Sequence, residues 1–104
     1  MVTALWDTGA DITVVDRELV TSHPELFTAL RSASGTDSSG TTAMTDVCHM
    51  DGYRIADVLF AGHPVAVASL PEPMKMALGY PTLSQAIWSV DLPSGRWSVS
   101  RAHV

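Results

Sequence analysis

The apolar residues of this chain occur in short runs, and glycine, proline or polar turn residues separate each run from the next. Short β-branched and apolar runs with such boundaries are typical of strands. The chain therefore predicts a mainly β fold. The expected strands cover residues 3–6, 12–15, 43–50, 53–60, 65–70 and 74–78.

Turn and cap signals predict how these segments connect. Asp51-Gly52 is a hairpin signal between residues 43–50 and 53–60. Residues 32–42 are almost entirely Ser, Thr, Gly and Asp, which indicates a solvated loop or hairpin tip. Three further elements are expected: a brief helical turn over 24–30 capped by Ser22 or His23, one substantial helix over 81–88, and a closing hairpin of residues 88–92 and 96–100.

Size and composition limit the class of protein. The 104 residues are 46% hydrophobic and 16% charged, which supports one small domain spanning residues 1–104 with a buried core. A net charge of −5 with only six scattered Lys and Arg residues argues against a nucleic-acid partner. Cys48 is the single cysteine, so no intrachain disulfide can form. The chain shows no signal peptide and no run long enough to span a bilayer, and we expect a soluble, cytoplasmic protein without a membrane partner.

The segment that carries chemistry is Asp7-Thr8-Gly9-Ala10-Asp11, which lies between two of the expected strands. A carboxylate on a tight, glycine-containing turn between buried strands is held rigidly and can be aimed at a substrate. The neighbouring threonine hydroxyl can hydrogen-bond nearby backbone and fix the turn.

With this segment the chain resembles the retropepsin-like aspartic proteases, the single-domain enzymes of retroviruses and retrotransposons and their cellular relatives. Four features follow in the order of that family: the Asp7 segment, the Ser/Gly-rich window 32–40, the Asp51-Gly52 turn, and Ala77-Leu78-Gly79 before a short helix. The resemblance implies a closed, barrel-like β fold with one short C-terminal helix. It also implies a flap at residues 30–45.

The function implied by the resemblance is that of an aspartic endopeptidase. Peptide hydrolysis without a covalent intermediate needs a base to activate water and an acid for the leaving group. Two carboxylates held close together share one proton and supply both roles, as is established for aspartic proteases. Because this chain has a single Asp-Thr-Gly, the second carboxylate must be Asp7 of a second copy across a homodimer axis. The expected role is polyprotein processing, with a polypeptide substrate and no cofactor or metal.

The resemblance also assigns roles around Asp7. Thr8 would support the active site by hydrogen bonding across the dimer axis, and Gly9 would let the substrate backbone approach. The substrate-binding residues implied by the resemblance are Gly9, Ala10, Asp11, Ser34 and Gly35, the last two lying near the flap tip.

Departures from the family pattern leave a second interpretation open. Only six residues precede Asp7, where family members carry an N-terminal hairpin. Tyr80-Pro81 stands where an Arg would pair with Asp11, and Trp6 is bulkier than the usual aliphatic residue. The alternative is a catalytically weak or inactive module of the same fold that serves dimerisation or protein interaction.

Other chemistry-bearing side chains are interpreted as structural. Cys48 and His49 would point to opposite faces of a strand and therefore cannot easily share a metal ion. The histidines 23, 63 and 103 show no partner pattern and are expected on the surface or in loops. Trp88 and Trp97 are expected at an interface, because the apolar excess of this short chain hints at surface that a second chain covers.

Overall fold

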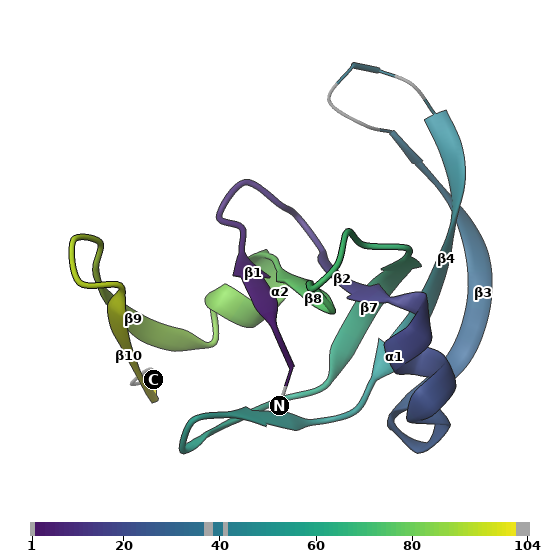
Figure 1. Ribbon diagram of the computed structural model, residues 1–104. Helices are drawn as coiled ribbons and strands as arrows, with labels where there is room; N and C mark the ends of the chain where they lie inside the picture. The colour runs from purple at the N-terminus through teal and green to yellow at the C-terminus, as the bar shows by residue number, and fades with distance from the viewer. Residues whose placement is uncertain (1, 37–38, 41, 102–104) are drawn as a thin grey trace.

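The computed structural model describes residues 2–36, 39–40 and 42–101. Two short α-helices, one 3-10 helix and ten strands make up this part of the chain (Figure 1). In chain order they are β1 (Ala4–Trp6), β2 (Thr13–Asp16), α1 (Arg17–Ser22), η1 (Pro24–Leu26), β3 (Phe27–Thr36), β4 (Thr42–Met50), β5 (Tyr53–Ile55), β6 (Val58–Phe60), β7 (His63–Ala68), β8 (Met76–Leu78), α2 (Tyr80–Leu83), β9 (Ala86–Asp91) and β10 (Arg96–Arg101).

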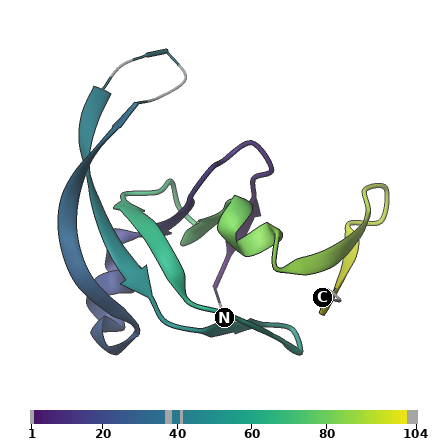
Figure 2. The ribbon, with the colours of Figure 1, turned by 180° about the vertical axis from the view of Figure 1, so that it is seen from behind.

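Six strands form one mixed sheet in the order β1-β8-β2-β7-β4-β3. Strand β8 lies between β1 and β2, parallel to the first and antiparallel to the second. The predicted mainly β fold is confirmed, but the predicted closed barrel is not, because in the described residues β1 and β3 are separate edges of an open sheet. Within the described part of the chain the three-residue β1 pairs only with β8, while the β3–β4 hairpin curves away on the far side of the sheet (Figures 1 and 2).

Several predicted strands are present with slightly different bounds, and two predictions were wrong. The expected strand 53–60 is two strands, β5 and β6, which form their own small hairpin. Asp51-Gly52 does not close a hairpin between its flanking strands, because β4 pairs with β3 and β7 instead. Pairing also extends into the polar window 32–42, where β3 continues to Thr36 and β4 begins at Thr42. The cross-strand ladder there outweighs the turn propensity of Ser and Gly.

The helices also differ from expectation. Helix α1 was not predicted, and α2 extends only over Tyr80–Leu83 where a helix over 81–88 was expected, because β9 begins at Ala86. The 3-10 turn at Pro24–Leu26 matches the first part of the predicted turn over 24–30, with His23 as its cap. The closing C-terminal hairpin is confirmed as β9 and β10. No helix in the described segments is long and apolar enough to cross a membrane.

The core lies on one face of the sheet, where β2, β3, β4 and β7 contribute apolar side chains. Leu19 and Val20 of α1 pack against this cluster and cover it. Alternation along β4 buries Cys48 and exposes His49, as the strand period requires. The buried members of the cluster are Val15, Phe27, Cys48, Met50, Val65 and Val67.

Asp16 connects α1 to the sheet. Its carboxylate accepts hydrogen bonds from the backbone N–H of Leu70 at 2.8 Å and of Glu18 at 3.0 Å, the second of which caps α1. The Leu70 hydrogen bond is the main reason that the pKa of Asp16 lies below its ordinary value of 3.8; burial opposes the shift, while Glu18 N–H and nearby Lys75 and Arg17 reinforce it.

Gly79 and Gly9 differ in how closely neighbouring atoms pack against them at the loop between β1 and β2. A β-carbon on Gly79 would lie 2.4 Å from the carbonyl oxygen of Ile12, whereas one on Gly9 would meet only Asp7 Oδ1, at 3.7 Å. We expect Gly79→Ala to lower the free energy of unfolding by about 1–3 kcal/mol in urea denaturation. Gly9→Ala, the matched control in the facing loop, should change it by less than about 0.5 kcal/mol. Equal effects of the two substitutions would contradict the close packing at Gly79.

The Asp16 contacts predict an acid-sensitive contribution to stability. A carboxyl whose pKa is lower in the folded state stabilises the fold above its unfolded pKa, and this contribution is lost as the pH falls through the folded pKa. Asp16→Asn should therefore unfold at lower urea than the wild type near neutral pH, with the difference shrinking below about pH 4. Asp91→Asn, an exposed substitution with the same charge change, should show no such convergence. A pH-independent Asp16→Asn effect would refute this account.

Candidate active site

The Asp7 segment is the loop that leaves β1 and enters β2, and its backbone closes a tight turn. The amide of Ala10 donates to the Asp7 carbonyl at 3.3 Å, and the amide of Gly9 donates to the Asp7 carboxylate at 3.2 Å. In the described residues the carboxylate has no other hydrogen-bond partner, and the side chain is only partly buried. One oxygen is thus oriented by the backbone while the other stays available.

The end of β8 clamps this loop from both sides. The amide of Asp7 donates to the carbonyl of Leu78 at 3.0 Å, and the amide of Tyr80 donates to the carbonyl of Ala10 at 2.9 Å. Between these two bonds, Gly79 packs directly on the backbone of Ile12. Only glycine allows this approach, so the Ala77-Leu78-Gly79 element and the Asp7 loop form one interlocked unit.

A buried chain of side-chain hydrogen bonds lies behind Gly79. Its amide donates to Thr13 Oγ1 at 3.0 Å; Thr13 and Thr82 hydroxyls lie 2.8 Å apart; Thr82 and Tyr53 hydroxyls lie 2.7 Å apart. The Tyr53 hydroxyl then reaches His63 Nε2 at 2.8 Å, and His63 Nδ1 lies 3.0 Å from the Pro64 carbonyl. Thr13 and Thr82 are fully buried, and no buried side-chain N or O atom in the described residues lacks a partner.

The chemistry of the two end groups fixes the donor at each end of this chain of hydrogen bonds. A backbone amide can only donate and a carbonyl can only accept, so Nδ1 of His63 carries the proton and Nε2 accepts from Tyr53. Thr13 accepts from the Gly79 amide, and the hydroxyls of Thr13 and Tyr53 both lie within hydrogen-bond distance of the Thr82 hydroxyl, which is also 3.3 Å from His63 Nε2. Burial raises the pKa of the Tyr53 hydroxyl, although its hydrogen bond with Thr82 partly offsets this effect, and the phenol therefore remains a donor.

Sequence reasoning missed this network. His63 was expected on the surface or in a loop, but it is the first residue of β7 and only 9% exposed. Its side-chain partners Tyr53 and Thr82 come from β5 and α2, and no local spacing links them. The only available signal was the presence of single polar residues, such as Thr13, in otherwise apolar segments. Of the other two histidines that carried the same expectation, His23 is exposed as expected, and His103 lies outside the described residues.

The remaining candidate residues lie around the loop and on the β3–β4 hairpin. Thr8, Gly9 and Asp11 are exposed and Ala10 is partly buried; within the described residues the side chains of Thr8 and Asp11 make no hydrogen bond or ion pair. Ser34 and Gly35 are in the paired part of the hairpin, opposite Met44 and Ala43. The hairpin and the Asp7 loop extend toward the same end of the molecule (Figures 1 and 2). Part of the predicted flap, residues 37, 38 and 41, lies outside the described residues.

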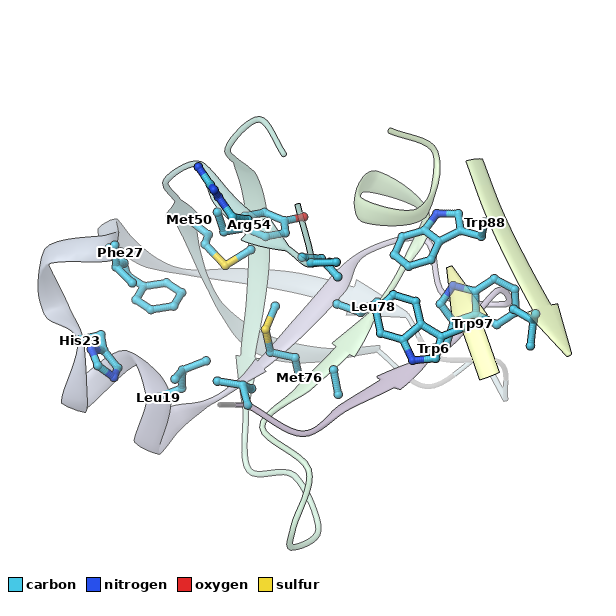
Figure 3. A pocket seen from close by; sticks show the side chains of 17 residues that line it. Trp6, Leu19, His23, Phe27, Met50, Arg54, Met76, Leu78, Trp88 and Trp97 are labelled. Carbon is cyan, nitrogen blue, oxygen red and sulfur yellow. The ribbon is translucent and has the colours of Figure 1, made fainter. Parts of the chain in front are cut away.

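A large apolar groove lies beside the Asp7 loop but does not include it. Its volume is about 950 Å³, and none of residues 7–11 lines it. Trp6, Trp88 and Trp97 form one end, with ring centroids 6.2 Å apart for Trp6–Trp88 and 6.1 Å apart for Trp88–Trp97 (Figure 3). Among the described residues that line it, His23 and Arg54 are the only basic ones.

In the part of the chain that the structure describes, no three His, Cys, Asp or Glu side chains are grouped to hold a metal ion. No protein-family model, curated protein or solved structure matches the chain.

The buried network yields a test of its direction and its strength. Thr13→Val keeps the shape of the side chain but leaves the Gly79 amide without its acceptor, and we expect a loss of about 1–3 kcal/mol in the free energy of unfolding. Thr13→Ser retains the hydroxyl and should recover most of that loss. Nitrogen NMR of His63 should show the Nδ1–H tautomer in the wild type. An Nε2–H tautomer, or equal stability of the Val and Ser variants, would contradict the network.

Proposed function

We propose that the chain is a homodimeric aspartic endopeptidase of the retropepsin-like type, in which Asp7 and Asp7 of a second copy form the catalytic pair. The observation that carries the proposal is the Asp7 carboxylate itself. It is partly buried, oriented through one oxygen by the Gly9 amide, and held on a loop that β8 clamps on both sides. A rigidly aimed carboxylate with a free oxygen is what general acid–base hydrolysis requires.

The chemistry follows from placing two such carboxylates together. Like charges at close range cannot both ionise easily, so the pair holds one proton between its members. The ionised carboxylate removes a proton from water as the water oxygen attacks the peptide carbonyl carbon, and the protonated partner donates to the carbonyl oxygen. Collapse of the tetrahedral intermediate breaks the C–N bond, and the leaving nitrogen receives a proton. Since the pair needs one proton, activity is expected at acidic to mildly acidic pH.

The substrate in this proposal is an extended polypeptide. The β3–β4 hairpin and the Asp7 loop extend toward the same end of the molecule (Figures 1 and 2), which supports clamping a strand between them. Gly9 and Ala10 would face the substrate backbone, Asp11 would contact it beside the cleft, and Ser34 and Gly35 would close over it and exclude water. Polyprotein processing is the proposed role.

A second candidate function is a non-catalytic dimerisation or interaction module of the same fold. It is favoured by one specific observation: Asp11 is exposed and makes no ion pair in the described residues, where the resemblance expects an arginine in place of Tyr80-Pro81. Binding of a statine-type transition-state analogue separates the two functions. A confirmed dimer that binds no such analogue favours the module.

Asp7→Asn tests the proposed chemistry directly. Replacing the carboxylate by an amide removes the base and the shared proton, so cleavage of a peptide library should fall by roughly 10²–10⁴-fold. Asp57→Asn, in the exposed turn between β5 and β6, makes the same chemical change away from the loop and should leave cleavage unchanged. Cleavage that survives Asp7→Asn at the wild-type rate would rule out the proposed catalytic role.

A further inference from the structure

The strand β1 offers an unpaired edge next to the apolar groove. In the described residues it hydrogen-bonds to β8 on one side only, and all three of its residues are exposed. Val2, Ala4 and Trp6, which alternate along this segment, line the groove, whereas Leu5 does not. A free backbone edge with every second side chain facing an apolar groove matches the geometry of strand addition.

The groove also has a charge preference. It contains no acidic lining residue, while Arg54 and His23 lie toward the end away from the three tryptophans (Figure 3). His23 is 3.5 Å from Glu25, but Arg54 forms no ion pair in the described residues. The chain as a whole carries a charge of −5. A free guanidinium at an otherwise apolar site favours an occupant that carries a carboxylate.

From these two observations we propose that the groove binds an extended polypeptide segment that adds as a strand to the free edge of β1. Its alternate apolar side chains fill the groove beside the tryptophans, and an acidic side chain reaches Arg54. This site is separate from Asp7, since none of residues 7–11 lines it, and the proposal does not depend on peptidase activity.

A strand of different sequence fits the groove better than a second copy pairing through its own β1. Residues 2–6 contain no carboxylate, so a copy joined through this segment brings no partner for Arg54 from the added strand. A small apolar molecule would fill the volume but would leave the backbone groups of the β1 edge without partners. Strand addition satisfies both the apolar surface and the backbone edge.

The chain carries its own reporter for this site, because all three of its tryptophans line the groove. The probe is a blocked peptide of about six alternating valine and threonine residues with glutamate at either end. Titration into the full chain should give a saturable blue shift of tryptophan fluorescence. The same peptide N-methylated at alternate residues keeps its apolar side chains but loses strand hydrogen bonds, and should bind at least about tenfold more weakly.

Two protein variants complete the test by calorimetry. Arg54→Gln should weaken binding of the glutamate peptide by about two- to fivefold and leave a glutamine-ended peptide unaffected. Leu59→Ala, an exposed apolar residue outside the groove, should change nothing. No spectral change at millimolar peptide, or equal binding of the N-methylated peptide, would overturn the proposal. A blue shift that grows with protein concentration alone and blocks the peptide would assign the groove to a second copy and overturn it as well.

Discussion

The close approach of Gly79 to the backbone of Ile12 determines where the Asp7 loop lies. A β-carbon at this position would be 2.4 Å from the Ile12 carbonyl oxygen, so the two segments can interlock only through glycine. Around this contact the Leu78 carbonyl accepts from Asp7 and the Tyr80 amide donates to Ala10. The loop that carries the carboxylate is therefore positioned by the end of β8, which is the last strand of this sheet along the chain. Its own turn propensity is not sufficient to place it.

Polar side chains are hydrogen-bonded behind this contact and largely unpaired in front of it. Behind Gly79, the buried hydrogen bonds of Thr13, Thr82, Tyr53 and His63 tie four separate elements together without leaving a buried side-chain donor or acceptor unpaired in the described residues. In front of it, Asp7 and the exposed Thr8 and Asp11 have uncommitted polar atoms. A satisfied network on one side and free polar groups on the other is the arrangement expected of a preorganised site on a stable scaffold.

The sequence predicted the local features of this arrangement better than the long-range ones. Apolar runs and turn residues were sufficient to place β1, β2, β4, β7 and the C-terminal hairpin, and the Asp7 turn, because each depends on neighbouring residues. The division of 53–60 into β5 and β6 is local, but it depends on a tight turn in which Ala56 takes a positive φ of 53°, and no glycine marks that turn in the sequence. The pairing of β4 with β7 depends on a partner distant in the chain. His63 could not be placed for the same reason, since its environment is built from Tyr53 and Thr82. The sheet is open because, in the described residues, β1 at one edge and β3 at the other each pair on one side only.

The central claim is that two copies of Asp7 form one catalytic site, and mixing experiments test it most directly. Wild-type and Asp7→Asn chains are mixed in varied proportions, unfolded and refolded together, and assayed for peptide cleavage at constant total protein. If each site needs Asp7 from both chains, activity follows the square of the wild-type fraction, so an equal mixture retains about a quarter of full activity. Activity proportional to the wild-type fraction, about half in the equal mixture, would contradict a shared site.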